Sequence, residues 1–196
     1  RDPYPLSWEE QTRLFQELPP DLARMALFKV NTGCREQEVC SLRWEWETPV
    51  PELGTSVFLI PAMRVKNREE RLVVLNQVAL SVVEEMRGVH QEYVFTYKEN
   101  PVQKMNSSAW RKARIRARLP QVRVHDLKHT FGRRLRAAGV SFEDRQDLLG
   151  HKSGRVTTHY SAAELGNLIE ASNRVCGENS RKSPALVVLK RKAAIA

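Results

Sequence analysis

Two short apolar runs, set among amphipathic helix patterns, constrain the fold of this chain more than any other feature. Residues 56–60 (Ser-Val-Phe-Leu-Ile) and 71–75 (Arg-Leu-Val-Val-Leu) have the β-branched and bulky apolar composition of strands. The polar residues 66–70 between them suit a turn, so the two runs predict an antiparallel hairpin. A further short strand is expected at residues 93–95. Since the other patterns are helical, we expect a mainly α fold with a small antiparallel β-sheet or hairpin, of the α+β class.

Helix signals fill most of the remaining chain. Ser7 and Glu10 have a capping-box pattern, which predicts a helix to about residue 18, where two prolines stop it. Asp21 is expected to cap a second helix and Gly33 to end it, whereas residues 48–51 are expected to form a loop. A third helix is expected to open at Arg35. Further helices are expected at about 76–87, 107–118, 125–138, 142–150 (capped by Ser141) and 161–174.

The composition fits a globular domain. The chain has 196 residues, 41% of them hydrophobic, which is enough for one domain with a sizeable core. It has no apolar run of the roughly 18 residues that a membrane span needs and no visible signal peptide, so we expect a cytoplasmic protein with no membrane partner. The three cysteines lack metal-type spacing and are expected to be reduced thiols.

Positive charge is concentrated in one segment. The net charge of the chain is +9, but residues 104–136 alone contain eleven Lys or Arg against one acidic residue, Asp126. The rest of the chain has 21 basic and 22 acidic residues. Such a concentrated field is typical of a polyanion site, because neutralising phosphates releases counterions, whereas a solvated helix face usually mixes charge signs. The charge distribution therefore favours nucleic acid as a partner.

The predicted helix at 125–138 carries two histidines and a lysine. His125 and Lys128 are three residues apart, so they share a helix face and could both reach one phosphate. His125 and His129 are four apart, which also permits a zinc site. Asp126 stands where the zincin pattern needs glutamate, and no third ligand follows at a suitable spacing, so no metal is expected. His129 is interpreted as a hydrogen-bonded interior residue.

Other candidate residues are scattered along the chain. Arg35 follows the Thr-Gly turn at the start of a helix, where a guanidinium can grip two anion oxygens and Glu38 can hold it in place. Lys66 lies by the hairpin turn. His151 follows Leu-Gly, and Tyr160 lies nine residues later. Taken alone, each of these residues is as compatible with an ordinary surface or packing role.

Taken together, these segments resemble the catalytic domain of the tyrosine recombinases, the phage integrase family. The pattern of that family is an arginine after a Thr-Gly turn, a lysine in a hairpin, a His-x-x-Arg helix, a Leu-Gly-His and a tyrosine shortly after it. Arg35, Lys66, His125, His151 and Tyr160 match the pattern in order and spacing, over roughly residues 7–175. The resemblance implies the fold of that catalytic domain.

One position departs from the family pattern. Lys128 stands where the family has its second arginine. Lysine keeps the positive charge but loses the planar, two-pronged grip of a guanidinium. The chain is then a natural functional variant, a weakened enzyme or a sequence carrying an introduced substitution. Because the charge is retained, we expect activity to be retained, changed at most in rate.

The resemblance implies an enzyme that cuts and rejoins DNA strands through a 3′-phosphotyrosyl intermediate, with no cofactor. Tyr160 would attack the scissile phosphate, and Lys66 and His125 would act as general acid and general base. The charge that develops on the phosphate oxygens would be stabilised by Arg35, Lys128 and His151. Contacts to the DNA backbone would come from Arg111, Lys112, Arg114, Arg116, Arg118 and Arg123.

The resemblance also implies partners and a domain plan. Double-stranded DNA would be bound by a homotetramer held together through the C-terminal segment. Residues 1–6, with Pro3 and Pro5, are expected to be the remnant of a linker, residues 7–175 the catalytic domain, and residues 176–196 a basic tail that is either exchanged between protomers or disordered. Two alternatives remain open at this stage, namely a DNA-binding module with impaired catalysis and a type IB topoisomerase-like enzyme.

Overall fold

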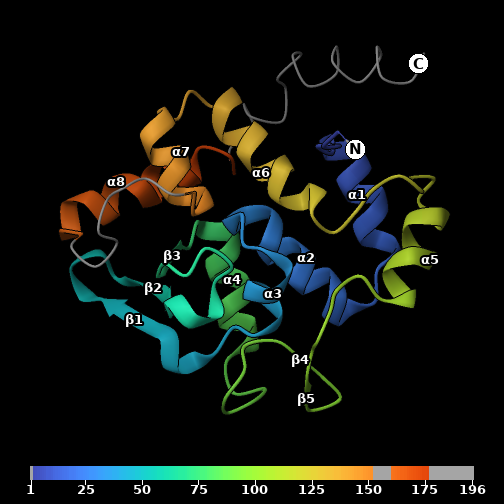
Figure 1. The fold of residues 1–196 in the computed structure, drawn as a ribbon, viewed down its shortest axis with the longest axis horizontal. Coiled ribbons are helices and arrows are strands. Elements are labelled where there is room, and N and C mark those ends of the chain that lie inside the picture. Colours follow the sequence, from blue (N-terminus) through green and yellow to red (C-terminus); the bar gives the residue numbers. More distant parts are fainter. Residues whose placement is uncertain (1, 152–159, 177–196) are drawn as a thin grey trace.

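The computed structural model describes residues 2–151 and 160–176 (Figure 1). Within these residues the helices are α1 (Trp8–Glu17), α2 (Pro20–Thr32), α3 (Glu36–Cys40), α4 (Gln77–Met86), α5 (Ser108–Arg116), α6 (Asp126–Ala137), α7 (Phe142–Leu149) and α8 (Ala162–Asn173). The strands are β1 (Glu47–Val50), β2 (Thr55–Ile60), β3 (Arg71–Val74), β4 (Thr96–Tyr97) and β5 (Asn100–Pro101). Short 3-10 helices occur at η1 (Trp44–Trp46), η2 (Pro51–Leu53) and η3 (Ala62–Arg64). The expected mainly α fold with a small antiparallel sheet is confirmed.

The sheet has one strand more than the predicted hairpin. Strands β2 and β3 pair antiparallel as expected, with Phe58 opposite Val73. The prediction of a loop at residues 48–51 is wrong, because β1 pairs antiparallel with β2 and places Thr48 opposite Val57. Proline suggested the loop, but β1 is an edge strand of this sheet, where a residue without an N–H is tolerated.

Two further expectations need correction. Helix α2 begins at Pro20 with Pro19 as its N-cap, so Asp21 lies in the first turn and does not cap the helix. Proline at the first helical position already has a helix-compatible φ angle. The strand expected at 93–95 is only an isolated bridge between Arg43 and Tyr93. The short hairpin β4–β5 follows it, with Lys98 and Glu99 at positive φ in the turn.

The remaining helix predictions are confirmed to within two residues at each end. The capping box forms at the start of α1, where the Ser7 hydroxyl accepts from the Glu10 amide and Glu10 accepts from the Ser7 amide. Ser141 caps α7 in the same manner, by accepting from the amide of Asp144. These caps satisfy backbone donors that have no partner inside the helix.

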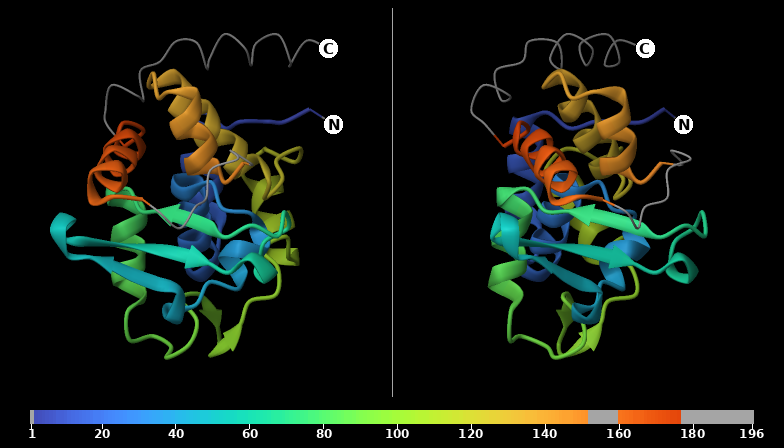
Figure 2. Two further views of the ribbon diagram at one scale, coloured as in Figure 1. Left: turned by 60° about the vertical axis from the view of Figure 1, so that its left-hand side comes forward. Right: turned by 90° about the vertical axis from the view of Figure 1, so that its left-hand side faces the viewer.

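The three-stranded sheet is covered on both faces. On β2, Phe58 and Ile60 belong to the main core with α2 and α4, whereas Val57 belongs to a second core with α6, α7 and α8. Side chains alternate between faces along β3 as well, with Val73 in the first core and Leu72 in the second. Figure 2 shows α7 and α8 on one side of the sheet and α4 on the other. A strand buried on both faces reads as a continuous apolar run, which is why β2 was recognisable in the sequence.

Helix α6 connects the two cores. Leu127 packs in the main core and Phe131 and Leu135 in the second, and all three are fully buried, as the predicted apolar stripe requires. The N-terminal segment lies along the start of this helix. The amide of Tyr4 donates to Asp126 Oδ1 at 3.1 Å and that of Leu6 to Thr130 Oγ1 at 2.9 Å.

Candidate active site

The turn between α2 and α3 places Arg35. Gly33 ends α2 in the left-handed conformation, with φ of 66°. A Cβ at this position would lie 2.9 Å from both Phe131 and Leu149, so the turn packs closely against α6 and α7. Glycine is required here for its backbone angle and for the close approach. The chain then enters α3 with Arg35 as the N-cap residue.

Glu38 holds Arg35 in place, as the sequence suggested. The Arg35 amide donates to Glu38 Oε2 at 2.6 Å and its Nη1 donates to Oε1 at 2.8 Å. Glu38 is 1% exposed, whereas the Arg35 side chain is a quarter exposed and can reach a ligand. Burial alone would raise the pKa of Glu38, but the positive charge of Arg71 and the donors of Arg35 outweigh it and lower this pKa.

Helix α6 contributes two imidazoles that touch each other. His125 is the N-cap residue of α6, and its ring meets that of His129 edge-on, with centroids 4.7 Å apart. Burial and the neighbouring positive groups lower the pKa of both residues, so both are mainly neutral at pH 7. His129 is half-buried at the edge of a cavity, which corrects its interpretation as an interior residue.

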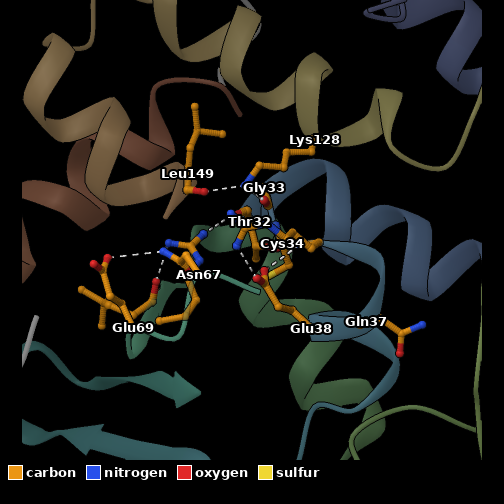
Figure 3. A network of polar contacts seen from close by, with 12 residues as sticks. Thr32, Gly33, Cys34, Gln37, Glu38, Asn67, Glu69, Lys128 and Leu149 are labelled. Atoms are coloured by element: carbon orange, nitrogen blue, oxygen red, sulfur yellow. Dashed lines mark hydrogen bonds and ion pairs between the residues drawn. The ribbon is translucent and has the colours of Figure 1, made fainter. Parts of the chain in front are cut away.

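Lys128 extends from α6 toward two backbone carbonyls (Figure 3). Its Nζ donates to Gly33 O at 2.8 Å and to Leu149 O, so it joins the turn after α2 to the end of α7. Lys128 is 6% exposed. Burial lowers its pKa to about 7, and the charges of Arg71 and Arg35 act in the same direction. An ammonium has three N–H donors, so within the described part of the chain one donor is left for a phosphate oxygen.

Helix α7 ends with the same left-handed geometry as α2 and places His151. Gly150 has φ of 60°, and the amide of His151 donates to Gln146 O at 3.0 Å. The His151 side chain is exposed. Partial burial of the ring, followed by the charges of Lys128 and Arg35, lowers its pKa, so it is mainly neutral at pH 7.

Lys66 lies in the loop between β2 and β3, as expected for a hairpin lysine. Val65 is buried and anchors the loop, and the amide of Arg68 donates to Val65 O at 2.9 Å. The Lys66 side chain is exposed. Beside it, Asn67 Nδ2 donates to Glu69 Oε2 at 3.4 Å (Figure 3). The ammonium of Lys66 is therefore available to a ligand.

These segments surround one cavity of about 960 Å³. Five of the six residues expected to be catalytic line it, namely Arg35, Lys66, His125, Lys128 and His151. These five residues come from four different segments, whereas the convergence expected from the sequence also included Tyr160. The cavity is also lined by Arg133, Arg136 and Arg145, which the sequence did not single out for this position. Only the packing of α6 against α7 brings these arginines to the cavity.

Tyr160 is not among the residues that line the cavity. It is half-buried and packs against the second core, directly before Ser161, the N-cap of α8. Helix α8 is itself held against β3 and α7 of the same chain. In this conformation the Tyr160 side chain packs against the second core.

The six basic residues expected to contact the DNA backbone differ in their surroundings. Arg116 donates from Nε to Glu17 Oε2 at 2.6 Å, and Arg114 donates to Val122 O at 3.0 Å. Arg123 forms an ion pair with Asp126 at 3.1 Å. Arg111, Lys112 and Arg118 are exposed and form no ion pair within residues 2–151 and 160–176. These three remain the α5-region cations best placed to meet a ligand.

Neither a metal cluster nor a membrane span is present among the described residues. No group of three or more His, Cys, Asp or Glu side chains in residues 2–151 and 160–176 is arranged to hold a metal ion. None of the described helices has the length and apolar character that crossing a membrane requires.

Comparison with known proteins gives one family match and several relatives. The family model described as the phage integrase family matches residues 8–165. The integrase of Salmonella phage P22 is 28% identical over 179 residues, which are 85% of this chain and 45% of that protein. Tyrosine recombinase XerA of Pyrococcus furiosus is 25% identical over 182 residues, which are 88% of this chain and 62% of that protein. The chain therefore spans about half to two thirds of the length of these relatives.

Solved structures support the same fold. The integrase of mycobacterium phage Brujita superimposes with a TM-score of 0.65 at 19% identity, covering 96% of this chain and 63% of that one. The XerH site-specific recombinase bound to its difH substrate, in a pre-cleavage complex, superimposes with a TM-score of 0.58 at 21% identity. That match covers 84% of this chain and 53% of the XerH chain. At 19% and 21% sequence identity, the structural similarity shows that this chain shares the fold of these proteins.

Proposed function

Because the chain belongs to the phage integrase family, we propose that it is the catalytic part of a site-specific DNA recombinase that cuts and rejoins DNA strands through a phosphotyrosine. The observation that carries this proposal is the convergence of Arg35, Lys66, His125, Lys128 and His151 on one cavity. The substrate is double-stranded DNA. XerH, which has the same fold, is bound to a DNA substrate in its solved structures.

The chemistry exchanges one phosphoester bond for another. The Tyr160 oxygen attacks the scissile phosphorus, the bond from phosphorus to the 5′ oxygen breaks, and a 3′-phosphotyrosine forms. The phenol proton passes to neutral His125, and Lys66 gives a proton to the leaving 5′ oxygen. A 5′-hydroxyl of another strand then attacks the phosphotyrosine and releases Tyr160. Since the ester energy is retained in the enzyme linkage, the cycle needs no ATP.

The donor groups of the cavity stabilise the phosphorane-like transition state. Arg35 offers a planar guanidinium fixed by Glu38, and His151 offers a ring N–H from a neutral imidazole. Lys128 contributes the donor that its two carbonyl contacts leave free in the described part of the chain. The backbone carbonyls and the buried lysine fix this arrangement before DNA arrives, so little reorganisation accompanies the reaction.

Tyr160 has to leave its packed position for this chemistry to occur. We infer that DNA binding brings the phenol from the second core to the cavity. The cavity without its nucleophile can bind a phosphate but cannot form the covalent adduct. On this proposal, the conformation with Tyr160 packed on the second core precedes cleavage.

The test is trapping of the covalent complex on a nicked duplex whose 5′ fragment is lost after cleavage. The wild-type protein should form an adduct that resists denaturation, and Tyr160→Phe should form none while binding DNA with unchanged affinity. Tyr97→Phe, at an exposed tyrosine on β4, is the matched control and should cleave normally. Absence of an adduct from wild-type protein that demonstrably binds the duplex would overturn the proposal.

The remaining proposals concern domains and assembly. We take residues 7–175 as the catalytic domain, residues 1–6 as a linker and residues 176–196 as a basic tail through which four copies assemble on DNA. Residues 177–196 lie outside the described part of the chain. Sedimentation of the protein with two DNA sites, with and without the tail, tests this assembly. A tetramer that persists without the tail would contradict it.

The cellular compartment follows from the substrate. We propose that the protein works in the cytoplasm of a bacterial cell, as a product of the cell itself or of a phage. Cell fractionation with a soluble marker protein tests this placement, and recovery in the membrane fraction would contradict it.

A further inference from the structure

Arg71 makes contacts that the proposed chemistry does not use. It is the first residue of β3 and is 3% exposed. Its Nη1 donates to Leu72 O at 2.7 Å and to Asp147 O at 2.8 Å, and its Nη2 donates to Leu148 O at 2.7 Å and to Thr32 O at 3.3 Å. One buried guanidinium thus joins β3, the end of α7 and the end of α2.

Three of the four carbonyls that Arg71 binds lie at helix ends, and one of these, Asp147 O, also accepts from the amide of Gly150 at 3.1 Å. Thr32 is the last residue of α2, and Asp147 and Leu148 belong to the last turn of α7. The last four carbonyls of a helix have no intrahelical donor, and they carry the negative end of the helix dipole. A cation with several fixed donors can satisfy both helix ends at once.

These two helix ends lead directly into the proposed active site. Arg35 follows Thr32 by three residues, and His151 follows Leu148 by three residues. Arg71 itself ends the loop that carries Lys66. The three segments that supply these side chains therefore meet at one guanidinium.

Electrostatic and steric evidence supports this arrangement. Burial raises the pKa of Glu38, and the charge of Arg71 is the largest influence that lowers it, so Arg71 lies close to the carboxylate that grips Arg35. On the other side, a Cβ at Gly150 would lie 2.5 Å from Cδ and Nε of Arg71. The absence of a side chain at Gly150 leaves room for the stem of the arginine.

We propose that Arg71 is a positioning residue, which sets the relative placement of Arg35, Lys66 and His151 by binding the backbone of the three segments that carry them. The residues that line the cavity include these three but not Arg71. Arg71 therefore acts through its neighbours and does not touch the phosphate. The inference rests on the proposed function for its effect on cleavage, but the positioning itself is measurable without DNA.

The experiment compares Arg71→Met and Arg71→Lys with Arg134→Met. Arg134 is the matched control, because it is also a buried arginine (2% exposed), on α6, but it contacts Trp8 and Gln11 away from the cavity. Arg71→Met removes the charge and all four contacts. Arg71→Lys keeps the charge, but a single ammonium cannot reproduce the planar set of donors. This variant therefore tests the same role if Arg71→Met folds poorly.

The first readout is the single-turnover rate of adduct formation at saturating protein. Both Arg71 variants should bind the duplex with a Kd within about threefold of wild type and cleave about 100-fold more slowly, the loss expected of a misplacement of about 1 Å. Arg134→Met should be less stable but should cleave within about threefold of wild type under conditions where it is folded. A normal cleavage rate in a folded Arg71 variant would overturn the proposal.

The second readout is the NMR spectrum of the protein without DNA. The amides of Gly33, Arg35, Gly150 and His151 should shift in both Arg71 variants and stay in place in Arg134→Met. The His151 pKa should rise in Arg71→Met, because burial and Lys128 lower it first but Arg71 also contributes. Unmoved amides would overturn the positioning role even if the wild type cleaves DNA. If the wild type forms no adduct while these shifts appear, the proposed function fails and the positioning stands.

Discussion

At the scale of single residues, Lys128 combines burial, two backbone contacts and a position at the wall of the cavity. It stands where the family pattern has an arginine, and the sequence left open what that change does. The structure shows a lysine whose ammonium already joins two helix ends and whose pKa burial lowers to about 7. Its charge at neutral pH is therefore only partial until an anion arrives.

The pH dependence of cleavage should differ between lysine and arginine at this position. A bound phosphate raises the pKa of Lys128 above about 7, yet the ammonium still loses its proton at a lower pH than any guanidinium. Relative to wild type, Lys128→Arg should therefore become increasingly active as the pH rises from 7 to 10. Ratios of adduct-formation rates across this range measure the effect and cancel the titration of Tyr160. A constant ratio would show that Lys128 does not act as a cation.

Lys128 should also make stability depend on pH. Between about pH 7 and its ordinary pKa of 10.5, the unfolded chain binds a proton at Lys128 that the folded chain has lost. The free energy of unfolding therefore rises with pH in this window, by at most about 1.4 kcal/mol per pH unit. Lys128→Met removes this contribution.

Urea denaturation at pH 7, 8.5 and 10 should show the stability of wild type minus that of Lys128→Met rising with pH. Lys29 is buried with a pKa of about 8 and titrates in both proteins, so it cancels from the difference. A difference that is flat or falls with pH would mean that the Lys128 pKa is not lowered by folding.

At the scale of elements, helix and strand identities followed from local patterns, because caps, prolines and apolar periodicity act over a few residues. The incorrect predictions concern segments whose structure depends on a neighbouring segment. Strand β1 forms around Pro49 because β2 offers it an edge, and Tyr93 forms only a bridge because its partner Arg43 lies outside any strand. The sequence indicated that helices end near Gly33 and Gly150. It did not indicate that Arg71 and Lys128 contact the backbone at both of these ends.

The end of α7 allows a prediction with a matched control. Gly150→Ala and Gly139→Ala both place a side chain at positive φ, 60° and 72°, after a helix. A Cβ at Gly139 meets nothing within 4 Å, so only the backbone strain remains, about 1 kcal/mol of unfolding free energy. A Cβ at Gly150 also displaces Arg71, so Gly150→Ala should be more destabilising and should slow cleavage. Urea denaturation and adduct formation measure the two effects, and equal behaviour of the two variants would contradict the close packing.

At the scale of the whole molecule, the concentration of charge indicated a polyanion partner, but the sequence could not say which cations face the site. Arg116 and Arg123 are bound to acidic groups of the protein, whereas Arg133 and Arg136 line the cavity. The packing of α6 against α7 determines which cations face the cavity, because residues that are adjacent in a basic segment point to different faces of a helix.

The salt dependence of DNA binding tests which cations meet the phosphates. If Arg133 and Arg136 each neutralise one phosphate, the double variant to glutamine should lower the slope of log K against log salt by about 1.8. Arg111→Gln with Lys112→Gln applies the same test to the exposed part of α5. Arg13→Gln with Arg24→Gln is the control, because carboxylates already balance both arginines, and it should leave the slope unchanged. An equal loss in the control would indicate a general charge effect.

The packing of α8 predicts that Tyr160 acts in its own chain. Helix α8 lies on β3 and α7 of the same chain, so the phenol begins on the protomer whose cavity it serves. A mixture of Arg35→Ala and Tyr160→Phe proteins should then form no adduct, because neither chain has a complete set of groups. Recovery of adduct on mixing would show that the tyrosine is supplied by another protomer.

The sequence by itself determined the helices and the hairpin, the concentration of positive charge and the five matching residues of the family pattern, because each is fixed by residue type and spacing along the chain. Tertiary structure alone decided that Arg71 binds the ends of two helices and that Lys128 is buried between them. It also decided that Tyr160 packs on the second core and does not line the cavity. Such contacts join distant segments, 95 residues apart for Lys128 and Gly33, and local pattern carries no information on which carbonyl a distant side chain will meet.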